Sequence, residues 1–314
     1  MVALTTPVRL ALGLAYDGAH FHGFAEQPGQ ATVAGALADA FERIGAGRLR
    51  VTCAGRTDAG VHALAQVVHV DCDAAWVAGW SGERDARRER GERSGPTDVP
   101  SPAHDPGVAS AVELPRLRDA LSGLCAASVT VWRVVAAPGG FDARHAATAR
   151  RYRYDIELGE PVDPLRRGRL WHVGTELDLS LLRLATDPIL GEHDFAAFCR
   201  RPPDRQDGPI VRRVTQARWT LPEPGVLRFE IEAGAFCHQM VRSIVGSIVA
   251  AGSGRTRPSD VLAQLRRGSR EGAPSPAPAH GLCLVAVDYP PELGGRWQWP
   301  AATSTQLART VSIA

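Results

Sequence analysis

The chain has 314 residues, of which 44% are hydrophobic, and its 36 cationic and 34 acidic side chains leave a formal net charge of +2. This length exceeds that of most single domains, so two domains are expected. With a net charge so close to neutral, charge alone gives no reason to assign the protein to nucleic-acid binding. All the cations are arginines, whose planar guanidinium groups suit phosphates and stacking on bases.

No stretch reaches the roughly 20 consecutive apolar residues that span a bilayer, and the N-terminal residues lack a signal-peptide pattern. The cysteines form no Cys-x-x-Cys pair, and most lie in apolar stretches, which is typical of buried free thiols in a reducing compartment. They are Cys53, Cys72, Cys125, Cys199, Cys237 and Cys283. We therefore expect a cytoplasmic protein.

Four elements are predicted in the first 75 residues: strands at 8–16, 48–54 and 64–71, and a helix at 32–47. The helix prediction depends on Thr32 as N-cap, on apolar residues at helical spacing and on two glycines near the end. The segment CAGRTDAGVHA, which joins the last two strands, carries one carboxylate, Asp58, among residues with almost no side chain. Loops at the ends of sheets often carry functional groups.

Residues of about 79–110 differ in composition from the rest of the chain. Five arginines and four acidic residues lie within 83–93 and are followed by Pro, Ser and Gly. A segment with so little to bury is expected to be a mobile surface insertion. An RNA-binding arm is the alternative, but the balanced charge favours a solvated linker.

A second set of elements follows: helices at 114–124, 177–190, 236–252 and 259–268, and strands at 128–137, 150–158, 211–221, 226–234 and 283–290. Alternation along strand 150–158 places Tyr152, Tyr154 and Ile156 on one face. Neighbouring strands with short connections favour antiparallel pairing, so the predicted fold class is α+β. Residues after Pro290 are predicted to form a loosely attached tail.

The segment around Asp58 is first of all a plausible turn, because Asp and Gly favour turns. A phosphate-binding loop would need Lys and then Ser or Thr after Gly60, where Val61 and His62 stand. The flanking glycines disfavour a helix that would present Asp58 and His62 together to a metal. Thr57 is adjacent to Asp58, a poor geometry for a hydroxyl nucleophile and its base. From the residues alone, two interpretations of Asp58 stay open: a structural turn residue and a functional acid.

Two other stretches pose similar choices. Arg242 lies on the predicted helix 236–252, whose apolar residues cover more than half of its circumference. Its side chain therefore either extends to solvent or pairs with a carboxylate. Tyr152 is either a core residue or, beside the arginines of ARRYRY, a platform on which a base stacks while the cations bind its phosphate.

These stretches together resemble the bacterial tRNA pseudouridine synthase A family. CAGRTDAGVHA is similar to the family's catalytic loop, FDARHAATARRYRY to its second motif, FCHQMVRSIVGSI to its third and GLCLVAVDYP to its closing strand. The opening LAYDGAHFHGF matches as well, and the resemblance covers roughly 8–75 and 111–290. Because the motifs occur together and in this order, they favour a functional Asp58 over a simple turn.

The resemblance implies two α/β domains, at 1–138 and 139–290, with a tail at 291–314. Their antiparallel sheets would join into one extended sheet, with the active site in the cleft between the domains. It also implies an isomerase that converts uridine to pseudouridine in the anticodon stem-loop of tRNA, at positions 38–40 of the tRNA. The enzyme would be a homodimer and would need no cofactor and no metal.

The residues carried over by position are the catalytic aspartate, Asp58, the active-site tyrosine that stacks on the target base, Tyr152, and the basic residue that pairs with the aspartate, Arg242. Arg56, His62 and Arg144 lie in the first two motifs and are expected to bind substrate with Tyr152. There are departures from the family: two alanines, Ala25 and Ala34, stand where Gln is common, LSGLCA replaces an Asn-rich segment, and the 79–110 insertion is extra. None of these departures falls on Asp58, Tyr152 or Arg242, but they affect what can be inferred about the contacts with tRNA.

The implied reaction breaks the N1–C1′ bond, turns the uracil and rejoins it through C5. Asp58 either attacks C1′ or drives elimination from the ribose, and the sequence does not choose between them. An enclosed carboxylate favours its neutral form, whereas a paired guanidinium favours the charged form. We therefore expect Arg242 within salt-bridge distance of Asp58, although 184 positions separate them. The rival hypotheses are a tRNA-binding protein without catalysis and a hydrolase that uses Asp58 as general base.

Overall fold

The computed structural model describes residues 7–81, 112–125, 127–159, 162–201 and 208–300. Within them the strands form one eleven-stranded sheet, whose main path runs β4-β1-β3-β10-β5-β9-β8-β7, with β2 on β3, β6 on β5 and β11 on β10. The strand bounds are β1 Val8–Tyr16, β2 Thr52–Cys53, β3 His62–Cys72, β4 Val129–Ala136, β5 Ala149–Leu158, β6 Trp171–Val173, β7 Gly191–Asp194, β8 Val211–Glu223, β9 Val226–Ala233, β10 Leu282–Asp288 and β11 Arg296–Gln298.

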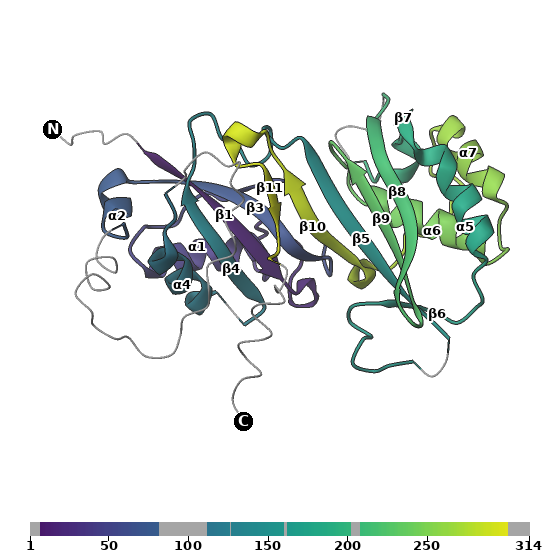
Figure 1. The fold of residues 1–314 in the computed structure, drawn as a ribbon, viewed down its shortest axis with the longest axis horizontal. Coiled ribbons are helices and arrows are strands. Elements are labelled where there is room, and N and C mark those ends of the chain that lie inside the picture. The colour runs from purple at the N-terminus through teal and green to yellow at the C-terminus, as the bar shows by residue number, and fades with distance from the viewer. Residues whose placement is uncertain (1–6, 82–111, 126, 160–161, 202–207, 301–314) are drawn as a thin grey trace.

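The C-terminal strand β10 joins the two halves of the sheet. It pairs antiparallel with β5, and it pairs parallel with β3 through Cys283 opposite His62 and Leu284 opposite Ala63. In Figure 1 the yellow β10 accordingly lies between the blue β3 and the teal β5. The predicted α+β class and the single extended sheet are confirmed. The sheet is mixed, because β3–β10 and β5–β6 are parallel pairs.

The helices form two groups, one in each half of the molecule (Figure 1). The N-terminal half carries η1 Gly18–His20, α1 Val33–Arg43, α2 Ala74–Ala78 and α4 Pro115–Leu124. The C-terminal half carries α5 Leu179–Thr186, η2 Asp187–Ile189, η3 Ala196–Phe198, α6 Met240–Gly252, α7 Pro258–Arg267 and η4 Ala279–Gly281. The short η5 Pro291–Leu293 connects β10 to β11 and lies toward the N-terminal half. Helices α5, α6 and α7 pack against one another beside β8. The division of the chain at residue 138 remains a prediction.

Local sequence explains where α1 and α6 begin and end. Thr32 caps α1 through a hydrogen bond from the Gly35 N–H at 3.2 Å, and α1 ends at Arg43, before the positive-φ Gly45. Helix α6 begins at Met240, four residues later than predicted, because Gln239 has a φ of 64°. A residue in the left-handed region interrupts a right-handed helix. Residues 236–239 are therefore a loop that leads into α6.

Two other predictions need correction. The strand predicted at 48–54 is reduced to the two residues of β2. The tail was predicted to be loosely attached, but in its described part, residues 291–300, β11 pairs with β10 and Trp297 is only 2% exposed. An indole ring of that size is stabilised by burial against the sheet. Helix α2 was not predicted, and the predicted insertion at about 79–110 lies mostly outside the described residues.

The cysteines divide into two classes. Cys53, Cys72, Cys125 and Cys283 are buried free thiols, as expected. The free-thiol interpretation is wrong for the other two, because Cys199 and Cys237 form a disulfide across 38 sequence positions. Cys199 follows η3 and Cys237 lies in the loop before α6, so only the fold brings them together.

No helix among the described residues is long and apolar enough to cross a membrane.

Candidate active site

The loop that carries Asp58 connects β2 to β3 and is held from several sides. The Gly55 carbonyl accepts a hydrogen bond from Gln66 Nε2 at 2.7 Å, and the Thr57 hydroxyl lies 2.8 Å from the Tyr16 hydroxyl. The Thr57 carbonyl accepts from the Phe24 N–H at 3.1 Å. Because the residues of the loop are small, its backbone can pack closely against β1, β3 and the segment after β1. Asp58 is presented by a fixed backbone.

Glycines permit the close approach of the segment after β1 to this loop. A Cβ atom on Gly18 would lie 2.1 Å from the Val61 carbonyl oxygen. At Gly23, which has a φ of +97°, it would lie 3.0 Å from the Thr57 carbonyl oxygen. Any side chain at Gly18 would force the backbone to move. The opening motif LAYDGAHFHGF therefore serves to support the catalytic-loop motif.

Asp58 is paired with Arg242, as predicted. Arg242 Nη1 lies 3.1 Å from Asp58 Oδ2, and the two side chains are 17% and 19% exposed. The Arg242 guanidinium is itself fixed, because its Nε donates to the Ala277 carbonyl at 2.8 Å. The Ala277 N–H in turn donates to the Arg242 carbonyl at 2.9 Å. The predicted ion pair is confirmed, while the catalytic roles of both residues remain predictions.

His238 was not predicted as a site residue, and it contacts the other oxygen of the same carboxylate. Its Nε2 lies 3.3 Å from Asp58 Oδ1. His238 belongs to the loop 236–239, four residues before Arg242, and its side chain is half exposed. The signal was available in the motif FCHQMVRSIVGSI, but sequence spacing does not reveal which of its polar residues turns toward Asp58.

Tyr152 lies on β5 and is only 7% exposed. Its ring meets the ring of Phe236 edge to face, with the centroids 5.2 Å apart. Burial raises the pKa of the Tyr152 hydroxyl, and the charge on Asp58 adds to that shift. The hydroxyl is therefore protonated at neutral pH. The predicted face of β5 is confirmed, since Tyr154 and Ile156 are fully buried beside it.

Arg150 joins the first two motifs and the segment before the third through backbone oxygens. It is 7% exposed, and its guanidinium donates to the carbonyls of Ala54, Arg144, Ala147 and Gly234 at 2.5–3.2 Å. These acceptors belong to the Asp58 loop, to the segment before β5 and to the segment that leads to α6. No carboxylate among the described residues forms an ion pair with it. Burial lowers the pKa of Arg150, and the carbonyl dipoles compensate its charge.

The interpretation of the ARRYRY arginines as phosphate contacts is therefore wrong for Arg150. It also loses support for the other two, which have carboxylate partners. Arg151 pairs with Glu232, and Arg153 Nε lies 3.3 Å from Asp155 Oδ2. A guanidinium already engaged by a carboxylate has less to gain from a phosphate.

The predicted substrate-binding residues differ in accessibility. Arg56 and Arg144 are exposed, both lie close enough to Cys53 to influence it electrostatically, and neither has an ion-pair partner among the described residues. His62 is buried, with Nδ1 3.1 Å from the Gly18 N–H and Nε2 3.0 Å from the Gly168 carbonyl oxygen. His62 thus has no free ring nitrogen for a substrate.

The described residues contain no group of three His, Cys, Asp or Glu that could hold a metal.

The site is accordingly a carboxylate with a side-chain nitrogen close to each oxygen, a buried protonated tyrosine and unpaired exposed arginines. Comparison with known proteins shows what the chain is similar to. A family model described as tRNA pseudouridine synthase matches residues 14–93 and 185–290. The chain is 40% identical over 287 residues to the tRNA pseudouridine synthase A of Frankia casuarinae, with 91% of this chain and 90% of the relative covered.

Two further relatives carry the same name. The tRNA pseudouridine synthase A of Streptomyces griseus is 37% identical over 292 residues, which cover 90% of this chain and 88% of the relative. That of Mycobacterium leprae is 37% identical over 290 residues, which cover 92% of each chain. The similarity therefore extends over both halves of the sheet.

Proposed function

The chain belongs to the tRNA pseudouridine synthase family, and we propose that it uses the Asp58 carboxylate to isomerise uridines of the anticodon stem-loop of tRNA. The enzyme is an isomerase that forms pseudouridine in tRNA. The choice of the anticodon stem-loop, at positions 38–40 of the tRNA, and the role of Asp58 are the proposal. The observation that carries it is the fixed carboxylate between Arg242 and His238, at 3.1 and 3.3 Å.

The reaction is an atom-balanced rearrangement. The N1–C1′ bond breaks, the uracil turns, a C5–C1′ bond forms, the proton on C5 leaves and N1 gains a proton. Nothing is oxidised and no water is consumed, so we propose that the reaction needs no cofactor. The step requires a charged carboxylate close to the ribose, either to attack C1′ or to drive elimination. The Arg242 guanidinium favours that charged form.

The target nucleotide must leave its stack before a carboxylate can reach its sugar. The small residues Gly55 and Ala59 on either side of Asp58 leave room for such a nucleotide. Tyr152 supplies an aromatic surface for the displaced base, and its protonated hydroxyl can relay the proton from C5. Arg56 and Arg144 are proposed to bind flanking phosphates, because neither is engaged by a carboxylate among the described residues.

The decisive experiment compares the parent enzyme with Asp58→Asn on tRNA that carries 5-tritiated uridine. We expect the parent to release tritium while the tRNA stays intact, and the variant to bind tRNA with similar affinity but release none. Tritium release by Asp58→Asn, after deamidation is excluded by mass spectrometry, contradicts the role of Asp58. Free uracil or cleaved RNA from the parent would instead support the hydrolase hypothesis.

The proposed target is tested separately with tRNA variants. Replacing the anticodon stem-loop uridines with cytidine should abolish tritium release, whereas the same replacement in another loop should leave it unchanged.

The family resemblance also leads us to propose a homodimer located in the cytoplasm. Sedimentation equilibrium at several protein concentrations checks the dimer, and a monomer at all of them contradicts it.

A further inference from the structure

We propose that His238 is a positioning residue for the Asp58 carboxylate, a role that depends on the proposed function of Asp58. The contact is direct, with His238 Nε2 3.3 Å from Asp58 Oδ1 while Arg242 holds Oδ2. Two unprotonated atoms would repel at this distance, whereas a ring that carries its hydrogen on Nε2 is attracted to the carboxylate. Each carboxylate oxygen then has a ring or guanidinium nitrogen close to it, which restricts the rotation of the carboxylate about its Cβ–Cγ bond.

The backbone of His238 is held in place on both sides. Its carbonyl accepts a hydrogen bond from the Arg200 N–H at 2.9 Å, and its neighbour Cys237 is disulfide-bonded to Cys199. On the other side, Gln239 adopts the left-handed φ of 64° and accepts a hydrogen bond from Arg270 at 3.2 Å. A non-glycine residue in this region persists only where its surroundings fix it. The loop therefore presents His238 to Asp58 in a defined orientation.

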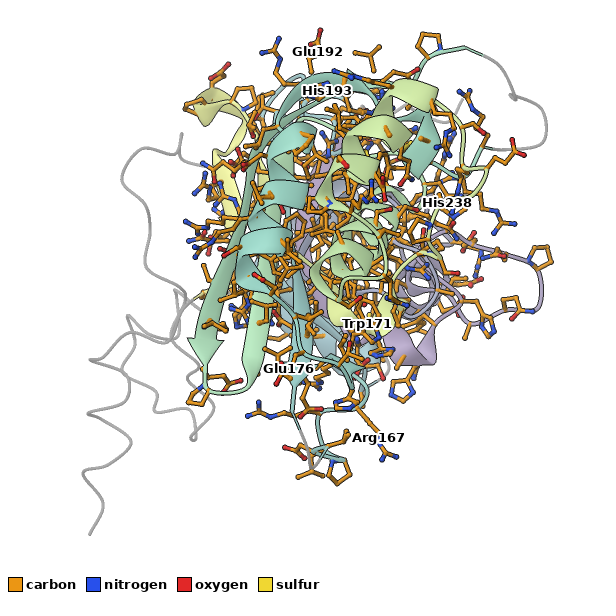
Figure 2. The ribbon with its side chains drawn as sticks, turned by 90° about the vertical axis from the view of Figure 1, so that its right-hand side faces the viewer. Arg167, Trp171, Glu176, Glu192, His193 and His238 are labelled. Atoms are coloured by element: carbon orange, nitrogen blue, oxygen red, sulfur yellow. A yellow bond between two sulfur atoms is a disulfide. The ribbon has the colours of Figure 1, made fainter. Side chains whose placement is uncertain are left out.

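The side chain of His238 is held differently from that of Arg242. The Arg242 guanidinium is anchored to the Ala277 carbonyl and is 17% exposed, whereas the His238 ring is 50% exposed. Figure 2 shows His238 on the outside of the ribbon, with purple N-terminal residues close by. Arg242 is thus the fixed and more buried partner of the carboxylate, and His238 is the more exposed one.

The charged and titratable groups around this contact come from several elements. Asp58 and Arg242 face each other directly, and the Tyr152 hydroxyl interacts electrostatically with Asp58. Arg200 and Arg270 lie beside the 236–239 loop and interact electrostatically with one another. Apart from Asp58 itself, these groups are cations or a neutral phenol. Removing one donor therefore leaves a carboxylate that is still in a positive environment, so the effect on turnover should be partial.

The experiment compares His238→Ala and His238→Gln with the parent in the tritium-release assay across a range of pH. Gln can place its Nε2 near the position of the histidine Nε2 and still donate a hydrogen bond. We expect His238→Ala to lower kcat about tenfold, the effect of losing one hydrogen bond to a charged group, with KM changed less than twofold. The acid limb of its kcat profile should move to higher pH, and His238→Gln should recover most of kcat.

The matched control is His145→Ala, which removes an exposed histidine paired with Asp142 at 3.2 Å, and which should leave kcat and the pH profile unchanged. A His238→Ala enzyme with the parent's kcat and pH profile overturns the inference, as does a loss confined to KM or a His238→Gln enzyme no better than the alanine variant. Asp58→Asn in the same assay separates the two proposals. If that variant is active, the proposed function fails; if it is inactive and His238→Ala is unchanged, only the role of His238 fails.

Discussion

Arg242 and Asp58 form an ion pair 3.1 Å apart across the two halves of the molecule, although 184 positions separate them in the chain. Arg242 comes from helix α6, and Asp58 comes from the loop between β2 and β3. The apolar surface of α6 leaves this cation few other partners, since the helix is buried over nearly its whole length. One contact thus links the packing of the C-terminal half to the loop with the proposed catalytic carboxylate.

Replacing Arg242 with Ala should damage both turnover and stability. We expect kcat to fall at least 100-fold and the acid limb of its pH profile to move to higher pH, because Asp58 then takes up a proton more readily. Stability should fall by about 2 kcal/mol, below the 3–5 kcal/mol typical of a fully buried pair, because both side chains are partly exposed. Urea unfolding and pH–rate profiles measure the two effects. An unchanged pH profile in a folded Arg242→Ala enzyme contradicts the pairing argument.

Tyr152 allows the ring and the hydroxyl to be tested separately. The buried hydroxyl is protonated at neutral pH, so it can relay a proton but is not a standing base. We expect Tyr152→Phe to keep KM near the parent value and to lower kcat about 100-fold, the usual size of an acid–base contribution. Tyr152→Ala should lose tRNA affinity as well, because the stacking surface is gone. Full turnover by Tyr152→Phe would exclude the relay.

Arg56 and Arg144 are predicted to contribute to binding through phosphate contacts. Single substitutions by Ala should weaken tRNA binding and reduce the slope of log affinity against log salt by about 1 each, with kcat at saturation unchanged. Filter binding at several salt concentrations measures the slope. Arg213→Ala is the matched control, because Arg213 is also exposed but pairs with Glu192 at 3.3 Å. An equal change in slope for all three variants contradicts a specific role for Arg56 and Arg144.

Arg150 is predicted to be a main structural support of the site. Its replacement by Met leaves buried carbonyls without a donor, each at a cost of about 1–3 kcal/mol, so we expect a total loss on the order of 3 kcal/mol or more. Arg150→Lys keeps the charge but cannot reach all four acceptors, and should be intermediate. The measurement is the urea midpoint, with the exposed Arg218→Ala as control. A parental midpoint for Arg150→Met would show that the carbonyl contacts contribute little.

The cysteines should differ sharply in reactivity toward iodoacetamide. Burial raises the pKa of Cys53, Cys125 and Cys283 to about 11 and that of Cys72 to about 12. Because the thiolate is the reactive form, these thiols should stay unlabelled in the native protein at pH 8. Mild reduction should allow labelling of the partly exposed Cys237, whereas Cys199, which is 1% exposed, should stay unlabelled until denaturation allows labelling of all six. Labelling of Cys53 in the native protein without reduction contradicts this prediction.

Short-range patterns in the sequence determined the local elements and the identity of the Asp58 loop. The alternation in β5 correctly predicted that Tyr152, Tyr154 and Ile156 share a buried face, and Thr32 correctly marked the start of α1. These predictions succeed because hydrophobic period and capping act over a few neighbouring residues. The ion pair of Asp58 with Arg242 was also predicted, because the family resemblance names the two residues as partners and an apolar helix and an enclosed loop each leave one charge that requires a partner.

Other features depend on contacts between residues far apart in the chain, which spacing cannot reveal. The ARRYRY sequence suggests three cations for phosphate, but burial and four backbone carbonyls, two of them on the distant residues Ala54 and Gly234, make Arg150 an internal support. His62 lies in the same motif as Asp58, yet each of its ring nitrogens already contacts a backbone group, the Gly18 N–H or the Gly168 carbonyl. His238 reaches Asp58 only because the sheet brings the two halves together, and Cys199 reaches Cys237 only because α6 packs beside η3 within the C-terminal half. The sequence supplies these groups, and the tertiary structure decides which ones meet, because each contact depends on the relative placement of several elements.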